Sequence, residues 1–129
     1  MDSLALEPAT RYAITAPTET VITEKIHFIR GHRVMLDRDL AELYGAEVKR
    51  LKEQVRRNIE RFPEDFMFEL TLEEAEASRS HSATLKRGEN IKYFPFVFTE
   101  HGILMLANVL RSEQAIAMSI HIIRVFTRM

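Results

Sequence analysis

One short stretch of the chain, residues 49–61, is rich in side chains that bind nucleic acid. Arginine, glutamine and asparagine can form paired hydrogen bonds with guanine and adenine edges in the major groove, and lysine and arginine also neutralise phosphates. This local composition predicts contact with double-stranded DNA. The candidate contact residues are Lys49, Arg50, Lys52, Gln54, Arg56, Arg57, Asn58 and Arg61.

The candidates divide into two tasks, base reading and backbone binding. We expect base contacts from Arg50, Gln54 and Arg57. We expect contacts with the DNA backbone from Lys49, Lys52, Arg56 and Arg61. The alternative is an ordinary solvated helix face, in which Glu53 and Glu60 pair with the neighbouring arginines.

A helix must position these side chains, and the residues before them predict a helix-turn-helix. A first helix should begin at Asp37, whose carboxylate can cap the opening turn, and should end at Tyr44. Gly45 then supplies the positive φ that a helix end and a tight turn require. The second helix should span about residues 47–59. Its apolar stripe, which must face the core, consists of Val48, Leu51, Val55, Ile59 and Phe62.

The bulk composition fits one globular domain with a tail. The chain has 129 residues, of which 46% are hydrophobic. We expect a flexible tail at residues 1–23 and the domain at 24–129. The net charge of −1 argues against a basic coat, so a nucleic-acid surface must be local. The absence of cysteine agrees with a cytoplasmic location, and no stretch has the pattern of a signal peptide or a membrane span.

Three segments with strand character predict a small antiparallel sheet and an α+β fold. A hairpin should join Ile26–Ile29 to Arg33–Met35 through Gly31 and His32, because glycine at the first central position suits a type II′ turn. Two further strands are expected, at residues 66–70 and 93–98. The second of these contains Pro95, which predicts an edge position or a bulge.

Between those two strands we expect a short helix and a polar loop. Thr71 and Glu74 have the spacing of a capping box, which predicts a helix at residues 72–78. Residues 78–90 form the loop, which could touch the DNA backbone or simply be a mobile surface segment. Its candidate contact residues are Arg79, Lys86 and Arg87.

Two apolar helices should complete the chain, capped by Thr99 and Ser112. The first is apolar nearly all round and belongs inside the fold. We expect the last helix to form a homodimer interface within residues 113–129, through Ile122, Val125 and Phe126. The alternative is that these three residues complete the monomer core. A protein-interaction module working through this helix is therefore the second functional hypothesis.

Residues suited to catalysis are sparse. The histidines are scattered without metal-ligand spacing, at positions 27, 32, 81, 101 and 121. Glu100 and His101 are sequence neighbours that do not face each other on a helix. The chain has no glycine-rich phosphate loop and no nucleophile elbow. We therefore predict no enzymatic activity, no metal site and no cofactor.

Three runs of the sequence resemble a known family. They are VMLDRDLAELYG, QVRRNIERFPEDFMFEL and FPFVFTEHGILMLANVL. Over residues 26–129 the chain resembles the ORF6N domain, a relative of the KilA-N and Bro-N modules of phages, prophages and large DNA viruses. The resemblance implies a DNA-binding domain of the kind found in phage antirepressors and other regulators of transcription. His101 departs from the family pattern, in which glutamine is more usual.

Overall fold

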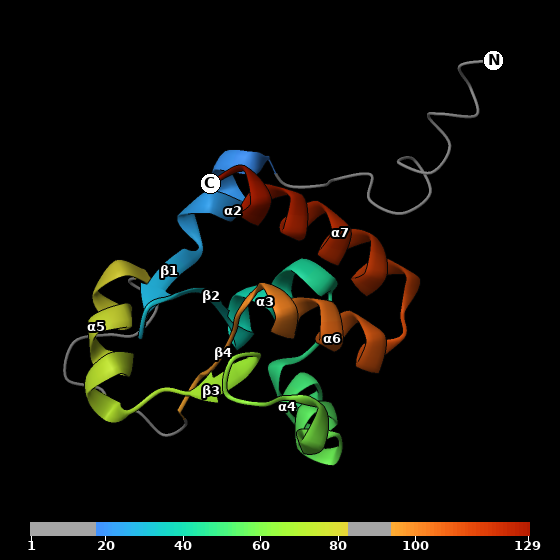
Figure 1. Cartoon of the computed structure of the whole chain (residues 1–129), viewed down its shortest axis with the longest axis horizontal. Coiled ribbons are helices and arrows are strands. Elements are labelled where there is room, and N and C mark those ends of the chain that lie inside the picture. Colours follow the sequence, from blue (N-terminus) through green and yellow to red (C-terminus); the bar gives the residue numbers. More distant parts are fainter. Residues whose placement is uncertain (1–17, 83–93) are drawn as a thin grey trace.

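The computed structural model describes residues 18–82 and 94–129, and it has the α+β fold that the sequence predicts (Figure 1). One antiparallel sheet has the strand order β1-β2-β4-β3. Its strands are β1 (Ile26–Ile29), β2 (His32–Leu36), β3 (Met67–Glu69) and β4 (Phe96–Phe98). The helices are α2 (Glu19–Glu24), α3 (Asp37–Tyr44), α4 (Val48–Arg57), α5 (Leu72–Ser82), α6 (Glu100–Leu110) and α7 (Glu113–Arg128), with the 3₁₀ turn η1 (Ile59–Arg61) after α4.

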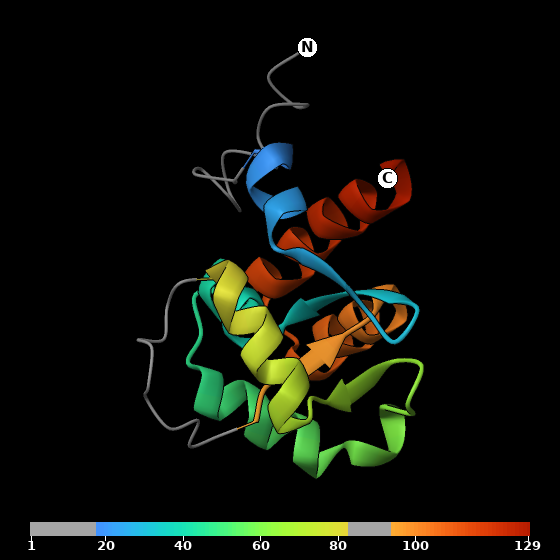
Figure 2. The same cartoon turned by 90° about the vertical axis from the view of Figure 1, so that its left-hand side faces the viewer.

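The sheet separates two hydrophobic cores because successive side chains of a strand point to opposite faces. Met35 and Phe98 enter the larger core, which they share with residues of α2, α3, α4, α6 and α7. Val34 and Val97 enter a smaller core that includes Ala75 of α5. Figure 2 shows α5 in front of the sheet, on the side away from α6. The larger core therefore lies on the face that also holds α3 and α4.

The three predicted strand regions are confirmed. The prediction that the last strand lies at an edge of the sheet, or contains a bulge, is wrong. β4 lies inside the sheet, paired with β2 on one side and β3 on the other. Pro95 precedes the strand, and its carbonyl accepts a hydrogen bond of 2.9 Å from the amide of Leu70. Because Pro95 lies before the paired residues of β4, its lack of an N–H removes no hydrogen bond from the sheet. Neither an edge position nor a bulge is therefore required.

The hairpin between β1 and β2 has a different turn from the one predicted. Ile29 pairs with His32, so the two loop residues are Arg30 and Gly31. Both have positive φ, 53° for Arg30 and 79° for Gly31. Positive φ at both central residues defines a type I′ turn, so Gly31 is the second central residue rather than the first.

Part of the predicted flexible tail is folded. Residues 19–24 form α2, in which the Thr18 hydroxyl accepts a 3.3 Å hydrogen bond from the amide of Val21. Ile22 is completely buried, and Glu19 forms a 2.8 Å ion pair with Arg128 at the end of α7. The prediction of a tail that extends to residue 23 is therefore wrong for residues 18–23, while residues 1–17 lie outside the described part of the chain.

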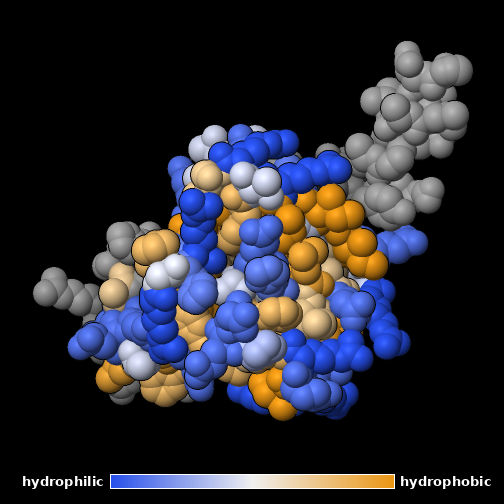
Figure 3. Space-filling view, in the orientation of Figure 1, coloured by the Kyte–Doolittle hydropathy of each residue, from blue (hydrophilic) through white to orange (hydrophobic). Residues whose placement is uncertain are grey.

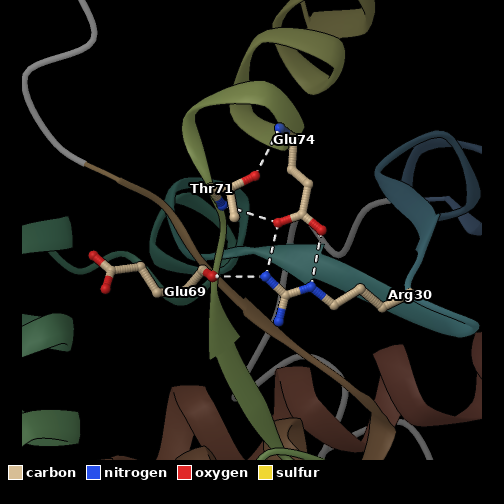
Figure 4. Close-up of polar contacts among 4 residues, drawn as sticks. All are labelled: Arg30, Glu69, Thr71 and Glu74. Carbon is tan, nitrogen blue, oxygen red and sulfur yellow. Dashed lines mark hydrogen bonds and ion pairs between the residues drawn. The ribbon is translucent and has the colours of Figure 1, made fainter.

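The capping box before α5 is confirmed, and the helix is longer than predicted because it continues to Ser82. The Thr71 amide donates to Glu74 Oε1 at 2.9 Å, and the Glu74 amide donates to the Thr71 hydroxyl at 3.2 Å. Figure 4 shows that Arg30, from the hairpin turn, reaches the same carboxylate. Its Nε and Nη2 each donate to Glu74 at 2.8 Å, and Nη2 also donates to the Glu69 carbonyl at 3.3 Å. Arg30 therefore joins the hairpin to β3 and α5.

Both C-terminal helices begin at the predicted caps, Thr99 and Ser112. The residues expected to form a homodimer interface are instead inside the monomer: Ile122, Val125 and Phe126 are all buried in the larger core. The prediction is wrong for these three residues because α2 and α3 also pack on α7 and cover that side. Among the helices of residues 18–82 and 94–129, none combines the length and apolarity needed to cross a bilayer.

Candidate nucleic-acid interface

The helix-turn-helix predicted from the sequence is present as α3 and α4. α3 ends at Gly45, which has φ of 71°. The Gly45 amide donates to the Glu42 carbonyl at 3.2 Å, and the Ala46 amide donates to the Ala41 carbonyl at 2.9 Å. A side chain at position 45 would also crowd Gln114, whose Nε2 would lie 3.0 Å from the added Cβ. Glycine is thus favoured at this turn both by backbone conformation and by packing.

The inner side of α4 follows the predicted stripe from Val48 to Val55, about two turns. Leu51 and Val55 are buried and Val48 is partly buried, and Phe62, which follows η1, is buried as well. Ile59, the next residue predicted for the stripe, is 52% exposed. The reason is that α4 ends at Arg57 and the chain continues as η1, so the spacing of an α-helix no longer applies at residue 59.

Lys52 does not belong to the outer surface, and its predicted role as a phosphate contact is wrong. The residue is 6% exposed. Its Nζ donates a 2.9 Å hydrogen bond to the Phe94 carbonyl and lies 4.4 Å from the centre of the Phe96 ring. It is also 3.7 Å from Asp37 Oδ2. Lys52 therefore attaches α4 to the segment at β4 and to the start of α3.

Asp37 has an inward role instead of the predicted capping role. The N-cap of α3 is Leu36, which cannot accept a hydrogen bond through its side chain. The completely buried Asp37 accepts a 2.9 Å hydrogen bond from the Phe96 amide through Oδ2. Burial raises the pKa of Asp37, and burial lowers the pKa of Lys52, while the attraction between the two groups opposes both changes.

Four cationic residues remain on the outer surface of α4. Lys49, Arg50, Arg56 and Arg57 are all exposed. Arg50 donates to Glu47 at 3.1 Å, and the Arg56 guanidinium lies 5.4 Å from the centre of the Phe96 ring. Within the described part of the chain, Lys49 and Arg57 have no ion-pair partner. The outer side of α4 therefore keeps cations available to an external anion.

The other three candidates make contacts within the fold. Gln54 is half-buried, and its backbone carbonyl accepts a 2.8 Å hydrogen bond from the side-chain amide of Asn58 at the end of α4. Arg61 donates a 2.9 Å hydrogen bond to Asn108 of α6. Arg79 lies in α5, but its side chain is outside the described residues, as are Lys86 and Arg87.

The alternative of a helix face neutralised by its own glutamates has limited support. Glu53 and Glu60 are exposed and have no ion pair within residues 18–82 and 94–129. On its outer side α4 instead carries an ion pair between Arg50 and Glu47, which the sequence prediction did not pair with each other. The described residues contain no group of three or more His, Cys, Asp or Glu side chains able to hold a metal ion.

The family model of the ORF6N domain matches residues 24–109 of the chain. The chain belongs to the ORF6N family. The ORF6N match begins just before β1, includes the whole helix-turn-helix and ends within α6, so α7 lies beyond it. No curated protein and no solved structure gives a significant match to this ORF6N chain.

Two features of the interface were missed by sequence reasoning. Phe96 lies beneath both Lys52 and Arg56, and Asn108 holds Arg61. A partial signal was present for Lys52, because it is four residues after Val48 and three before Val55, next to the buried stripe. No comparable signal was present for Asn108, which is 47 residues from Arg61.

Proposed function

We propose that this ORF6N domain binds double-stranded DNA by placing the outer side of α4 in the major groove. The observation that carries the proposal is the set of exposed cations on the second helix of a helix-turn-helix, while its other side is fixed to the core. The second helix of such a motif has the dimensions to enter the major groove. The resemblance to phage regulatory proteins adds a biological setting, a regulator of antirepressor type.

The exposed cations of α4 form two rows along the helix, which we assign to different parts of the DNA. Arg50 and Arg57 are seven residues apart, which is about two turns and about 10.5 Å along a helix. That length corresponds to about three base pairs of B-DNA at about 3.4 Å each. We assign Arg50 and Arg57 to base edges, with Gln54 beside them. Lys49 and Arg56, also seven residues apart, form the second row and are assigned to phosphates.

Glu53 lies between these two rows on the same exposed side. A carboxylate there repels phosphate but can accept a hydrogen bond from cytosine N4. Glu53→Gln should therefore raise the affinity for unrelated duplexes severalfold and reduce preference for the selected sequence. Selection of bound sequences from random duplex DNA, followed by titration of the selected and scrambled duplexes, measures both effects. Equal gains on both duplexes would remove Glu53 from base reading.

The main test compares two exposed arginines in different parts of the fold. Arg57→Gln should lose about 1–3 kcal/mol of binding free energy on the selected duplex. Arg33→Gln, a matched change in β2 of the hairpin, should leave binding unchanged. Binding is measured by fluorescence anisotropy at several salt concentrations. The proposal fails if the wild-type chain shows no salt-dependent binding to any duplex, or if both variants lose the same affinity.

A further inference from the structure

The outward side of α7 carries an apolar stripe that the monomer leaves largely uncovered. Ile116 is 46% exposed and Ile120 is 47% exposed, while Ile123, beside them, is partly buried and packs against the edge of the larger core. In the space-filling view of Figure 3, hydrophobic surface extends over α7 at the upper right of the molecule. The core uses the other side of the same helix. Folding of the monomer therefore does not account for Ile116 and Ile120.

The spacing of the stripe matches a helix-pairing seam. Ile116, Ile120 and Ile123 are separated by four and then three residues, and Thr127 continues the pattern four residues later. Alternating steps of three and four keep side chains on the seam between two packed helices. We propose that a second copy of this chain packs against the stripe, with the two α7 helices antiparallel.

The charges beside the stripe support the antiparallel orientation. Glu113 and Arg124 are eleven residues apart, close to three full turns, so they lie along the same flank of α7. Two antiparallel helices related by a twofold axis bring like flanks together. Glu113 then faces the partner's Arg124, and Ile116 faces the partner's Ile120. In a parallel pair the like flanks lie on opposite sides, and these charges do not meet.

Both charged residues are available for this contact. Glu113 and Arg124 are exposed, and neither has an ion-pair partner in the part of the chain that the structure describes. α7 has 16 residues, so a single helix pair buries less area than the roughly 1,200 Å² at the lower end of stable interfaces. We therefore expect a weak dimer, with Kd on the order of micromolar. The stripe includes no residue assigned to DNA, so its test is independent of the proposed DNA binding.

Sedimentation equilibrium of the chain tests whether a second copy packs against the stripe. The wild type should show a monomer–dimer equilibrium, and Ile120→Lys should weaken it by roughly 30-fold or more, because each dimer loses two apolar contacts. Leu104→Lys is the matched control, since Leu104 is 50% exposed on α6 outside the stripe. Far-ultraviolet circular dichroism verifies folding. A monomer at all concentrations up to about 1 mM, or a dimer unaffected by Ile120→Lys, overturns the proposal.

Charge reversal provides a test that leaves the isoleucines in place. Glu113→Arg and Arg124→Glu should each weaken the dimer by about tenfold, and the double variant should regain most of the affinity. Both residues are exposed, so these variants should fold. If the double variant is as weak as the singles combined, the proposed contact between the two charges is refuted.

Disulfide formation tests the orientation, and the natural chain has no cysteine to interfere. Glu113→Cys and Arg124→Cys are prepared as separate chains, mixed and oxidised. The antiparallel pair predicts that the mixed disulfide exceeds both disulfides between identical chains. A prevalence of disulfides between identical positions indicates parallel helices and overturns the proposal.

Discussion

The ion pair that holds α4 and the ion pair that holds α5 fasten their helices in different ways. Lys52 and Asp37 are almost entirely inside the protein, with 3.7 Å between Nζ and Oδ2. Arg30 and Glu74 lie near the surface, and two guanidinium nitrogens each donate to the carboxylate at 2.8 Å. The buried pair thus has the longer separation, and the surface pair has the better hydrogen-bond geometry.

The comparison predicts that the shorter ion pair is not the one that contributes more to stability. Burial opposes the charged forms of both Lys52 and Asp37, as the directions of their pKa changes indicate. Removing one member leaves a buried group without its compensating charge, which is costly. At the other site, hydrogen bonding from Arg30 lowers the pKa of Glu74 to about 2, but water can replace a lost partner there.

The largest effect is expected from Lys52→Ala. We expect a loss of about 3–5 kcal/mol in the free energy of unfolding, because Asp37 keeps its place in the core without Lys52. Urea unfolding followed by circular dichroism measures the change. Lys49→Ala, three residues earlier on the exposed side of the same helix, is the control and should change stability by less than about 0.5 kcal/mol. A loss below about 1 kcal/mol for Lys52→Ala would indicate that the pair is structurally dispensable.

A double-mutant cycle between Lys52 and Asp37 should change the free energy of unfolding by less than Lys52→Ala does, but by more than a change at the surface pair. Lys52→Met keeps the apolar stem, and Asp37→Asn keeps an acceptor for the Phe96 amide. We expect Lys52→Met to cost about 1–3 kcal/mol less in the Asp37→Asn background than in the wild type, because the buried carboxylate is then absent. Equal costs in both backgrounds would mean that Lys52 acts through the Phe94 carbonyl and the Phe96 ring alone.

The smallest effect is expected at the surface pair, and it should depend on pH. Because the pKa of Glu74 is lower in the folded state than the ordinary 4.5, its ionised form stabilises the fold above pH 4.5. This contribution is lost as the pH falls towards 2. At pH 7, Glu74→Gln should cost about 1 kcal/mol or less.

The difference in unfolding free energy between wild type and Glu74→Gln, measured from pH 7 to pH 2, isolates this contribution. It should shrink below pH 4.5, whereas Glu73→Gln, an exposed neighbour, should produce little difference at any pH. If the difference stays constant down to pH 2, the stabilisation does not come from the ionised form of Glu74 and the prediction is wrong.

Features set by neighbours in sequence were predictable. The capping box of Thr71 and Glu74 depends on a spacing of three residues, and Gly45 ends α3 through its own backbone conformation. The α+β class and the helix-turn-helix followed from such local patterns. The ORF6N family was predictable because three runs match in the same order.

Features that depend on distant partners were not predictable. Lys52 binds a carbonyl 42 residues away, and Asp37 binds an amide 59 residues away. From helical spacing alone, Lys52 lies at the border between the apolar stripe and the solvent side, and either environment was compatible. Likewise, the burial of Ile122 required the position of α2, a segment with too little periodicity to be predicted as a helix.

The location of the Lys52 amine has a consequence for chemical labelling. An acylating reagent needs direct access to a neutral amine, so it should modify Lys49 quickly and Lys52 only when α4 separates from the segment at residues 94–96. Both lysines belong to the same helix, so one mass-spectrometric time course reports both rates. The Lys52 rate would measure how often the helix opens, under conditions in which the rest of the protein remains folded.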